Sequence, residues 1–366
     1  MSIALKELVR EPRRFLPVWV ALTLLVVLLV ILGGFLDGLS RSQTGPYRAY
    51  DGDVWVFDTA ANRQLQRSRV ADTAVTADSV PGIDAVGSLD ATFTVAAVGD
   101  SGGDPAELQD IVLYGYDLAS TALPEPPGDG EIVVDRQLQR QAPFEVGDTI
   151  TIGPSDEPMT VTAVVDDLTN GAPTVWVNPD EWRRLVTTVN PAALPPQGFH
   201  QALVVQPAEG TDATTLAPAI SGLDGVEGVT VAQAIDALSV VQQQTSTFTA
   251  IIAVTFVVSL LVVALFFALI TLEQTRLYAV LKALGARTGE LLRGISVQAV
   301  VITAVALVVG IALSAIIVVV LPPTLPVRVL PVRIVQISLG LLATALVGGL
   351  LTARRILRID PASSIG

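Results

Sequence analysis

Four long apolar stretches dominate the pattern of hydrophobic and polar positions along the chain. Residues 15–36, 247–272, 294–321 and 334–353 contain no charged side chain. An α-helix rises about 1.5 Å per residue, so about 20 such residues cover the hydrocarbon core of a bilayer. The pattern therefore predicts four membrane-spanning helices, one before and three after a long polar segment at 37–246.

The first apolar stretch has a competing interpretation as a secretory signal peptide. The apolar region of a signal peptide is usually shorter, about 7–15 residues, and a small-x-small cleavage site follows it. The sequence Gly33-Gly34-Phe35-Leu36-Asp37 does not supply a good site of this kind. We therefore expect 15–36 to be an uncleaved anchor.

The polar segment 37–246 carries short runs of β-branched and aromatic residues bounded by Gly, Asp or Pro. Such runs predict strands, and the pair Gly147-Asp148 predicts a turn before one of them. The segment is 210 residues long, which is enough for one or two compact domains. The expected strands are 53–57, 91–96, 111–116, 149–152, 159–165, 201–206 and 229–232.

Charge gives these segments an orientation in the membrane. The segments 1–14, 273–293 and 354–366 together carry 11 Lys and Arg against five Asp and Glu, whereas 37–246 carries nine Arg against 30 acidic residues. Basic residues near spans favour the cytoplasmic side. We therefore expect a multi-pass protein of the cell membrane, with both termini and 273–293 cytoplasmic, and with 37–246 and the short loop 322–333 external.

The acidic external segment argues against nucleic acid as a partner, because the electrostatic term would be repulsive. An acidic surface could otherwise simply keep the domain solvated. The spans contain no Asp, Glu, Lys, Arg or His, so no buried ionisable group indicates a proton relay or an ion path. Small residues in the spans either permit close helix packing or reflect the ordinary excess of Gly in membrane helices: Gly33, Gly34, Gly310, Ser314, Gly340, Gly348 and Gly349.

No catalytic or metal site emerges from the residues. The chain has no Cys, a single His and no GxxxxGK[ST] phosphate loop, so the sequence offers neither thiolate ligands nor its own ATPase motif. We expect His200 to be a loop histidine, because no Ser-His-Asp or HExxH arrangement surrounds it. The pair Asp166-Asp167 is typical of turn chemistry. The sequence predicts a non-catalytic chain without a cofactor or metal of its own.

The segment between the second and third spans predicts a short amphipathic helix. Leu277, Val280, Leu281 and Leu284 fall at helical spacing, and Gly285 is a suitable C-terminal stop. Basic side chains would project from the polar side of this helix. One interpretation is a basic loop that rests on the membrane surface.

The other interpretation comes from a resemblance. The run LKALGA at 281–286, which follows Glu273 and Arg276, resembles the signature of FtsX-like, MacB-type ABC transporter permeases. The resemblance implies a cytoplasmic coupling helix that docks onto a separate ABC ATPase, which would bind ATP and Mg. One departure is Leu277, where the family often has an acidic residue. The implied coupling residues are Glu273, Arg276, Lys282, Ala283, Leu284, Gly285 and Ala286.

The external segment also resembles this family over 131–182, where Val146-Gly147-Asp148-Thr149 is similar to a family motif. The resemblance implies an α/β domain interrupted by a β-rich subdomain, here at about 119–199. The fold expected is thus an α+β membrane protein with four transmembrane helices and a large external α/β domain that carries an inserted β-rich subdomain. Pro361 and Ala362 resemble the family's C-terminal ending, and 38–40 with 49–53 resemble its heme-efflux (HrtB) and heterocyst-exporter (DevC) branches.

Two principal functions follow from the resemblance. The first is the permease half of an ABC exporter, which would act as a dimer in the surrounding lipid and extrude an amphipathic substrate such as heme or a lipid-like molecule. A cleft for that substrate would be lined by aromatic residues where the first two spans leave the membrane, and these residues could equally form an aromatic belt at the interface: Phe35, Tyr47, Tyr50, Phe248 and Phe256. A porphyrin would need an axial donor, for which a Tyr or a carboxylate would have to serve.

The second function is that of an FtsX-like force transmitter, which moves no substrate and regulates an external partner such as a cell-wall hydrolase. A membrane-anchored receptor is a third hypothesis, which the LKALGA run disfavours. The size of the external segment and its inserted subdomain favour the exporter.

Overall fold

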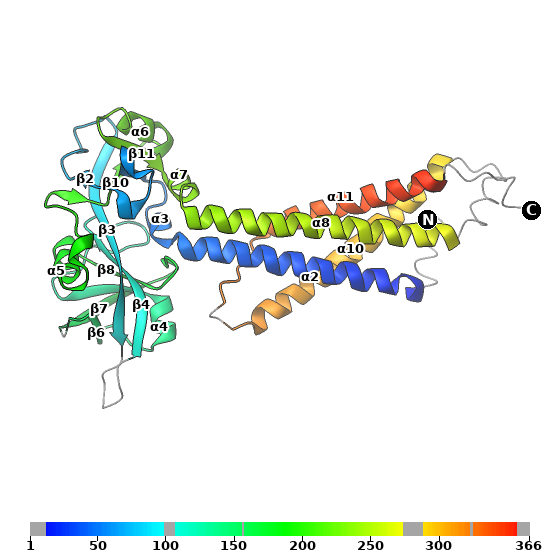
Figure 1. Ribbon diagram of the computed structural model, residues 1–366, viewed down its shortest axis with the longest axis horizontal. Helices are drawn as coiled ribbons and strands as arrows, with labels where there is room; N and C mark the ends of the chain where they lie inside the picture. The colour runs from blue at the N-terminus through cyan, green and yellow to red at the C-terminus, as the bar shows by residue number, and fades with distance from the viewer. Residues whose placement is uncertain (1–11, 99–106, 156, 274–287, 323–324, 357–366) are drawn as a thin grey trace, which may run out of the picture. The chain divides into compact units, whose positions relative to one another are not determined.

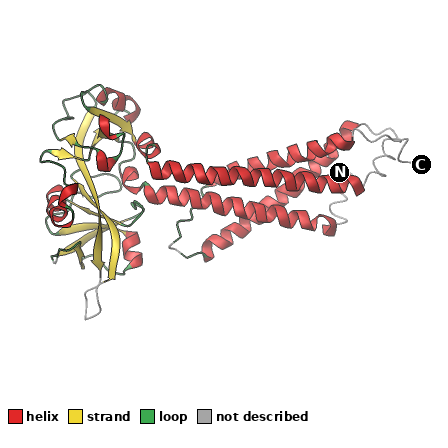
Figure 2. Ribbon diagram, viewed as in Figure 1, coloured by secondary structure: helices red, strands yellow, loops and turns green. Residues whose placement is uncertain are grey.

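The computed structural model describes residues 12–98, 107–155, 157–273, 288–322 and 325–356. The chain divides into two compact units. The helical unit comprises the chain up to Leu39 and from Gln244 onward, and the sheet domain comprises Ser40–Gln243. Figure 2 shows that the two units differ in secondary structure: the strands all belong to the sheet domain.

The helical unit contains four long helices that are apolar enough to cross a membrane. They are α2 (Pro12–Gln43), α8 (Ser239–Glu273), α10 (Thr288–Val320) and α11 (Pro331–Ile356) (Figure 1). Each begins before the corresponding uncharged stretch, because polar residues at both ends continue the helical hydrogen bonding. Many apolar side chains on these helices are exposed, among them Leu24, Val254 and Val308, as expected of surfaces that face lipid.

Close contacts at glycine hold these helices together. A Cβ at Gly310 of α10 would lie 2.5 Å from Val26 of α2, and one at Gly340 of α11 would lie 2.7 Å from Phe256 of α8. A Cβ at Gly348 would lie 3.0 Å from Val263. At these three positions the small residues permit close helix packing, which is the first of the two explanations that the sequence left open.

The sheet domain is built on one nine-stranded mixed sheet with the order β11-β1-β10-β3-β4-β8-β5-β7-β6. The pairs β4–β8 and β5–β7 are parallel and the other pairs are antiparallel. The strands are β1 (Val54–Asp58), β3 (Ile83–Val98), β4 (Glu107–Tyr116), β5 (Glu131–Asp135), β6 (Thr149–Ile152), β7 (Pro158–Val165), β8 (Thr174–Val177), β10 (Ala202–Pro207) and β11 (Val226–Thr230). A separate small sheet pairs β2 (Val70–Ala71) with β9 (Phe199–His200).

A further pairing of β6 with β3, at Ala96↔Ile152, closes part of the large sheet on itself. The strands β3, β4, β8, β5, β7 and β6 therefore form a closed ring around a hydrophobic cluster that includes Met159, Trp182 and Ile152. The segment 119–199 supplies β5 to β8, while the long strands β3 and β4 come from outside it. The β-rich module is thus continuous with the rest of the sheet.

Short helices accompany the sheet: α3 (Gly45–Ala49), α4 (Arg136–Gln141), α5 (Pro179–Val189), α6 (Ala213–Ile220), α7 (Val231–Asp236) and the 3-10 turns η1 (Thr59–Ala61), η2 (Leu65–Arg67) and η3 (Pro191–Ala193). The predicted strand 229–232 extends too far along the chain. β11 stops at Thr230, whose side chain accepts a hydrogen bond from the Gln233 amide while the Gln233 side chain bonds back. This capping box starts α7 at Val231, where the β-branched residues had predicted a continuing strand.

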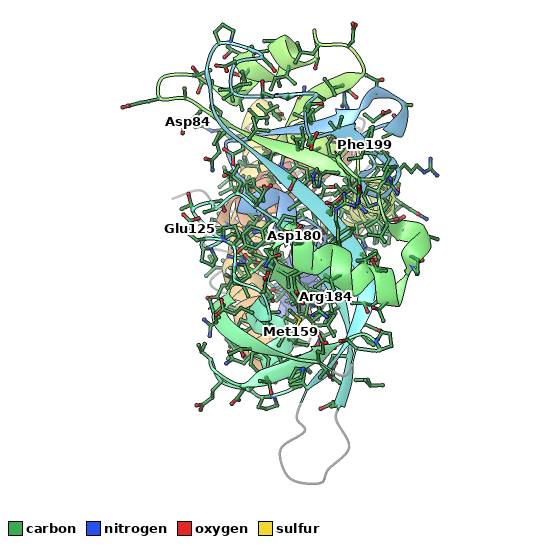
Figure 3. The ribbon with its side chains drawn as sticks, turned by 90° about the vertical axis from the view of Figure 1, so that its left-hand side faces the viewer. Asp84, Glu125, Met159, Asp180, Arg184 and Phe199 are labelled. Carbon is green, nitrogen blue, oxygen red and sulfur yellow. The ribbon has the colours of Figure 1, made fainter. Side chains whose placement is uncertain are left out.

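The second core of the sheet domain is aromatic. Trp55 of β1 stacks on Tyr47 of α3 with ring centroids 4.3 Å apart, and Trp176 of β8 stacks on Tyr114 of β4 at 4.5 Å. Acidic side chains such as Asp84, Glu125 and Asp180 are exposed around these cores (Figure 3). The acidic residues thus solvate the surface of the domain, and the aromatic residues stabilise its interior.

Candidate functional site

The predicted coupling segment lies mostly outside the described residues. Arg276, Lys282, Ala283, Leu284, Gly285 and Ala286 fall in 274–287, of which the structure describes nothing. Glu273 is the last residue of α8, and α10 begins at Thr288. The helices on either side of the segment are therefore defined, and its role stays a prediction.

The five aromatic residues of the predicted cleft belong to two different units. Phe35 on α2 and Phe248 on α8 are half-buried in the helical unit, and Phe256 packs on Gly340. Tyr47 and Tyr50 belong to the sheet domain. Tyr50 is a core residue of that domain and not part of a membrane cleft, because its ring is buried and its hydroxyl donates to the Leu118 carbonyl at 2.9 Å.

Within the helical unit, the segment between α10 and α11 packs on the end of α2. The Arg328 amide donates to the Gly34 carbonyl at 2.8 Å. A Cβ at Gly38 would lie only 1.8 Å from the Pro326 carbonyl oxygen. Arg333 donates from two nitrogens to the buried carboxylate of Asp37, at 2.6 and 3.2 Å. We call this arrangement the α2 clasp (residues 325–333 on α2).

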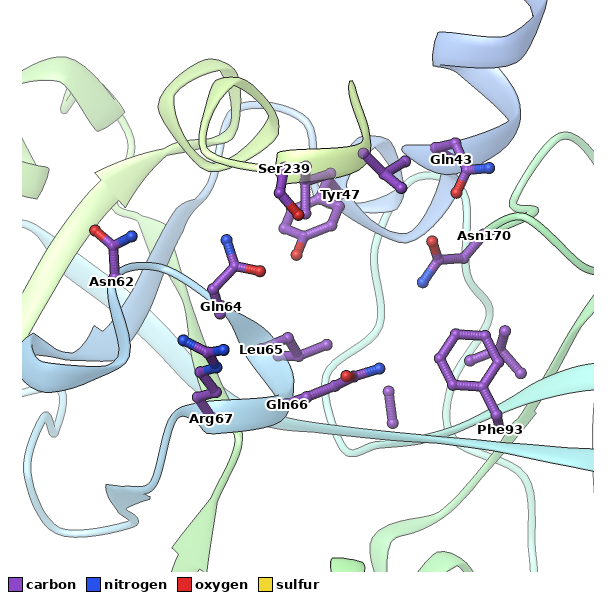
Figure 4. A pocket seen from close by; sticks show the side chains of 14 residues that line it. Gln43, Tyr47, Asn62, Gln64, Leu65, Gln66, Arg67, Phe93, Asn170 and Ser239 are labelled. Carbon is purple, nitrogen blue, oxygen red and sulfur yellow. The ribbon is translucent and has the colours of Figure 1, made fainter. Parts of the chain in front are cut away.

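The sheet domain contains a cavity of about 500 Å³ (Figure 4). Its walls come from the two ends of the domain's chain, from η2 and from the middle of β3 and β4. The lining residues are Gln43, Tyr47, Asn62, Gln64, Leu65, Gln66, Arg67, Ala91, Phe93, Val112, Asn170, Leu238, Ser239 and Val240. We call this space the η2 cavity.

Tyr47 is the most constrained polar group of the η2 cavity. Its ring is held by the stack on Trp55 and only 3% of the residue is exposed. Figure 4 shows its hydroxyl pointing into the cavity, between Gln64 and the side of Asn170. No other residue that the structure describes hydrogen-bonds to this hydroxyl. Burial raises the pKa of Tyr47, so the hydroxyl keeps its proton and can donate it.

Two other polar side chains of the η2 cavity are already partly engaged. Gln64 donates from Nε2 to the Ala237 carbonyl at 3.0 Å, which holds its side chain in place. Asn170 donates from Nδ2 to the Tyr114 hydroxyl at 2.6 Å. The amide oxygens of both side chains remain as acceptors.

Arg67 is the single charged residue among those lining the η2 cavity. It is exposed at one side of the space, and no ion pair joins it to another described residue. No acidic residue lines the cavity, although 37–246 carries 30 of them. Of these lining residues the sequence predicted only Tyr47 as a binding residue, and in a membrane cleft, because the lining is assembled from positions as far apart as 43 and 240.

His200 is not a loop histidine as expected. It lies in the short strand β9, and its Nδ1 is 2.7 Å from Asp90 Oδ2. The buried Asp90 also accepts from the Gln201 amide at 2.8 Å, so Asp90 ties His200 and Gln201, just before β10, to β3. Among the described residues, no group of His, Asp and Glu has a metal-binding arrangement.

Comparisons with known proteins define the class of protein to which this architecture belongs. A model of the MacB-like periplasmic core domain matches residues 20–223, and a model of the FtsX-like permease C-terminal region matches residues 249–361. The first match covers more than half of the chain. The chain belongs to the FtsX-like, MacB-type family of ABC transporter permeases, and it is a multi-pass membrane protein. The predicted family and the predicted α+β fold with four membrane helices are confirmed.

Similar proteins include an uncharacterized ABC transporter permease of Mycobacterium tuberculosis, 33% identical over 148 residues that cover 39% of this chain and 41% of that protein. HrtB of Staphylococcus haemolyticus, named as a putative hemin transport system permease protein, is 27% identical over 111 residues, 30% of this chain and 32% of that protein. The aligned region thus spans well under half of either relative.

Among solved structures, the periplasmic region of MacB from Actinobacillus actinomycetemcomitans is 12% identical with a TM-score of 0.35, covering 50% of this chain and 91% of that one. The extracellular domain of the transporter YknZ from Gram-positive bacteria is 12% identical with a TM-score of 0.33, covering 48% of this chain and 99% of that one.

Proposed function

We propose that the chain is the permease subunit of an ABC efflux transporter, which acts as a dimer with a separate ABC ATPase. ATP hydrolysis by that partner would drive the extrusion of an amphipathic substrate. Membership in the permease family is the observation that carries the proposal. The permease itself would be non-catalytic, and ATP and Mg would be bound by the partner.

The route for mechanical coupling is helix α8. It begins at Ser239, beside the η2 cavity, and ends at Glu273, next to the predicted coupling segment. An unbroken helix of 35 residues is about 50 Å long, more than the thickness of a bilayer core. Force applied to the segment 274–287 by the ATPase would therefore reach residues 239–243 of the sheet domain through one helix.

Charge supports the orientation that this coupling requires. The basic segment 273–293 would face the cytoplasm, where ATP is available, and the acidic sheet domain would face the outside. The similarity to HrtB, whose name refers to hemin, supports an amphipathic substrate.

The test is the rate of ATP hydrolysis and of substrate export in membranes that contain the chain together with its proposed ABC ATPase partner. Lys282→Glu reverses one surface charge of the coupling segment, and Gly285→Pro costs about 3 kcal/mol if that position is helical. Both variants should lose export while they still insert. The control Arg140→Glu makes the same charge reversal on α4 of the sheet domain and should export normally. Normal export by both coupling variants, at normal abundance, would contradict the docking role.

The alternative function, force transmission to an external partner, predicts a different pattern in the same assay. The coupling variants would then change the activity of a cell-wall hydrolase, and no amphipathic molecule would accumulate in cells that lack the chain. That result would show that the chain exports no substrate, while the coupling to an ATPase partner would still hold.

A further inference from the structure

The η2 cavity has the features of a ligand site that the permease function does not require. Its volume of about 500 Å³ suits a small organic molecule, since ligand pockets commonly measure about 300–1,000 Å³. All of its lining residues belong to the sheet domain. The polar and apolar groups of this lining decide which ligand it can bind.

The polar part of the lining offers hydrogen-bond donors to an anion. The ring of Tyr47 is buried, whereas its hydroxyl points into the space and has no partner among the described residues. The hydroxyl is therefore available to donate a hydrogen bond to an acceptor of the ligand. The Arg67 guanidinium adds positive charge and several further donors.

The distribution of acidic residues in the domain also favours an anionic ligand in this cavity. The segment 37–246 carries 30 acidic residues, and none of them lines the η2 cavity. The cavity therefore combines an unpaired arginine with neutral walls, which removes the repulsion that an anion would meet elsewhere on the domain. A cationic ligand would find no carboxylate to pair with here.

An aromatic side chain lies on the side of the space opposite to Arg67. Figure 4 shows Phe93 across the cavity from Arg67. Phe93 is 58% exposed, so much of its ring is open to a ligand in the space. Val112, which pairs with Phe93 across β4 and β3, also lines the cavity. A ligand that filled the space would thus need one anionic end and one apolar end.

We propose that the η2 cavity binds an amphipathic molecule with a single anionic head group, held by Arg67 and the Tyr47 hydroxyl, and with its apolar part against Phe93 and Val112. The head group is a phosphate ester or a carboxylate, which present the same acceptor oxygens to these donors. Binding needs no ATP, so its failure and the failure of the permease function are separate results.

The test measures binding of hexyl phosphate to the full chain in phosphatidylcholine nanodiscs by isothermal titration calorimetry. Arg67→Gln removes a charge-assisted contact and should weaken binding at least about tenfold, and Tyr47→Phe removes one neutral hydrogen bond and should weaken it about fivefold. Tyr47→Phe keeps the ring that stacks on Trp55, so the fold is retained. Arg140→Gln, an exposed arginine outside the cavity, is the matched control and should bind as the original chain does.

Hexanol and hexyltrimethylammonium should bind far more weakly than hexyl phosphate, because they lack the anion. Equal affinity of Arg67→Gln and the original chain, or equal binding of hexanol, would overturn the proposal. Nanodiscs of phosphatidylglycerol separate two sources of the same head group: if the ligand is a lipid, they should weaken the apparent affinity for hexyl phosphate by competition. Unchanged affinity would assign the site to a soluble amphiphile.

Discussion

Replacing Gly38 by Ala tests the α2 clasp directly. An added Cβ would lie 1.8 Å from the Pro326 carbonyl oxygen and 2.4 Å from the Pro326 carbonyl carbon. Ordinary carbon–oxygen contacts measure about 3.3–3.6 Å, so the peptide would have to move by roughly 1.5 Å. The obstructing atoms belong to the backbone, and no flexible side-chain end can give way.

The expected cost follows from this geometry. Overpacking of a well-packed site costs about 1–3 kcal/mol, and a backbone clash belongs to the upper part of that range. Gly→Ala within a helix also gains up to about 1 kcal/mol of helix propensity, which offsets part of the clash. Gly294→Ala in α10 is the matched control, because its Cβ would meet no atom within 4 Å and it receives the same propensity gain.

The assay is equilibrium unfolding of the full chain in mixed detergent micelles, followed by tryptophan fluorescence. The free energy of unfolding of Gly38→Ala should lie about 1–3 kcal/mol below that of Gly294→Ala. Equal values for the two variants would refute the packing of 325–333 on α2. A loss of the Arg328–Gly34 backbone contact should accompany the shift, visible as faster amide exchange at Arg328.

Two further predictions rest on individual groups. Arg333→Gln should lower the free energy of unfolding by about 2–3 kcal/mol in the same assay, because Asp37 is buried and would lose its partner. Asp37→Asn combined with Arg333→Gln should recover most of this loss. Arg333→Gln as stable as the original chain would contradict the role of the pair. Burial, followed by the charge of Asp51, raises the pKa of Asp53 to about 7, above the unfolded value of about 3.9. The stability that protonated Asp53 contributes is therefore present below about pH 4 and is lost as pH rises through about 7. Asp53→Asn should shrink the fall in thermal unfolding temperature between pH 5 and pH 8, whereas Asp84→Asn at an exposed site should not, and identical pH profiles for the two variants would contradict the raised pKa.

The sequence predicted those parts of the fold whose signals are local. Uncharged apolar runs of about 20 residues identify membrane helices because a helix satisfies all its backbone hydrogen bonds within one segment. Alternating β-branched runs likewise identified strands such as β1, β6 and β7. The end of β11 was wrong because Thr230 and Gln233 form a cap that overrides the β propensity of the neighbouring residues.

The candidate sites were harder to predict because they depend on contacts between distant residues. Tyr47 and Tyr50 follow a span and suggested an interface, yet both pack on Trp55 in the core of the sheet domain, Tyr47 by stacking and Tyr50 edge to face. The β3–β6 pairing that closes the ring of strands joins Ala96 to Ile152, and no local signal in the sequence specifies this register. The η2 cavity likewise exists only once the fold has brought its lining together.

The sidedness of the membrane protein is the most direct test of the account, because ATP-driven coupling requires 274–287 inside and the sheet domain outside. The chain has no Cys, so single cysteines can be introduced one at a time. A membrane-impermeant maleimide should label Arg140→Cys in intact cells and Lys282→Cys only after permeabilisation. Labelling of Lys282→Cys in intact cells, with Arg140→Cys protected, would contradict the proposed permease orientation and with it the coupling to a cytoplasmic ATPase.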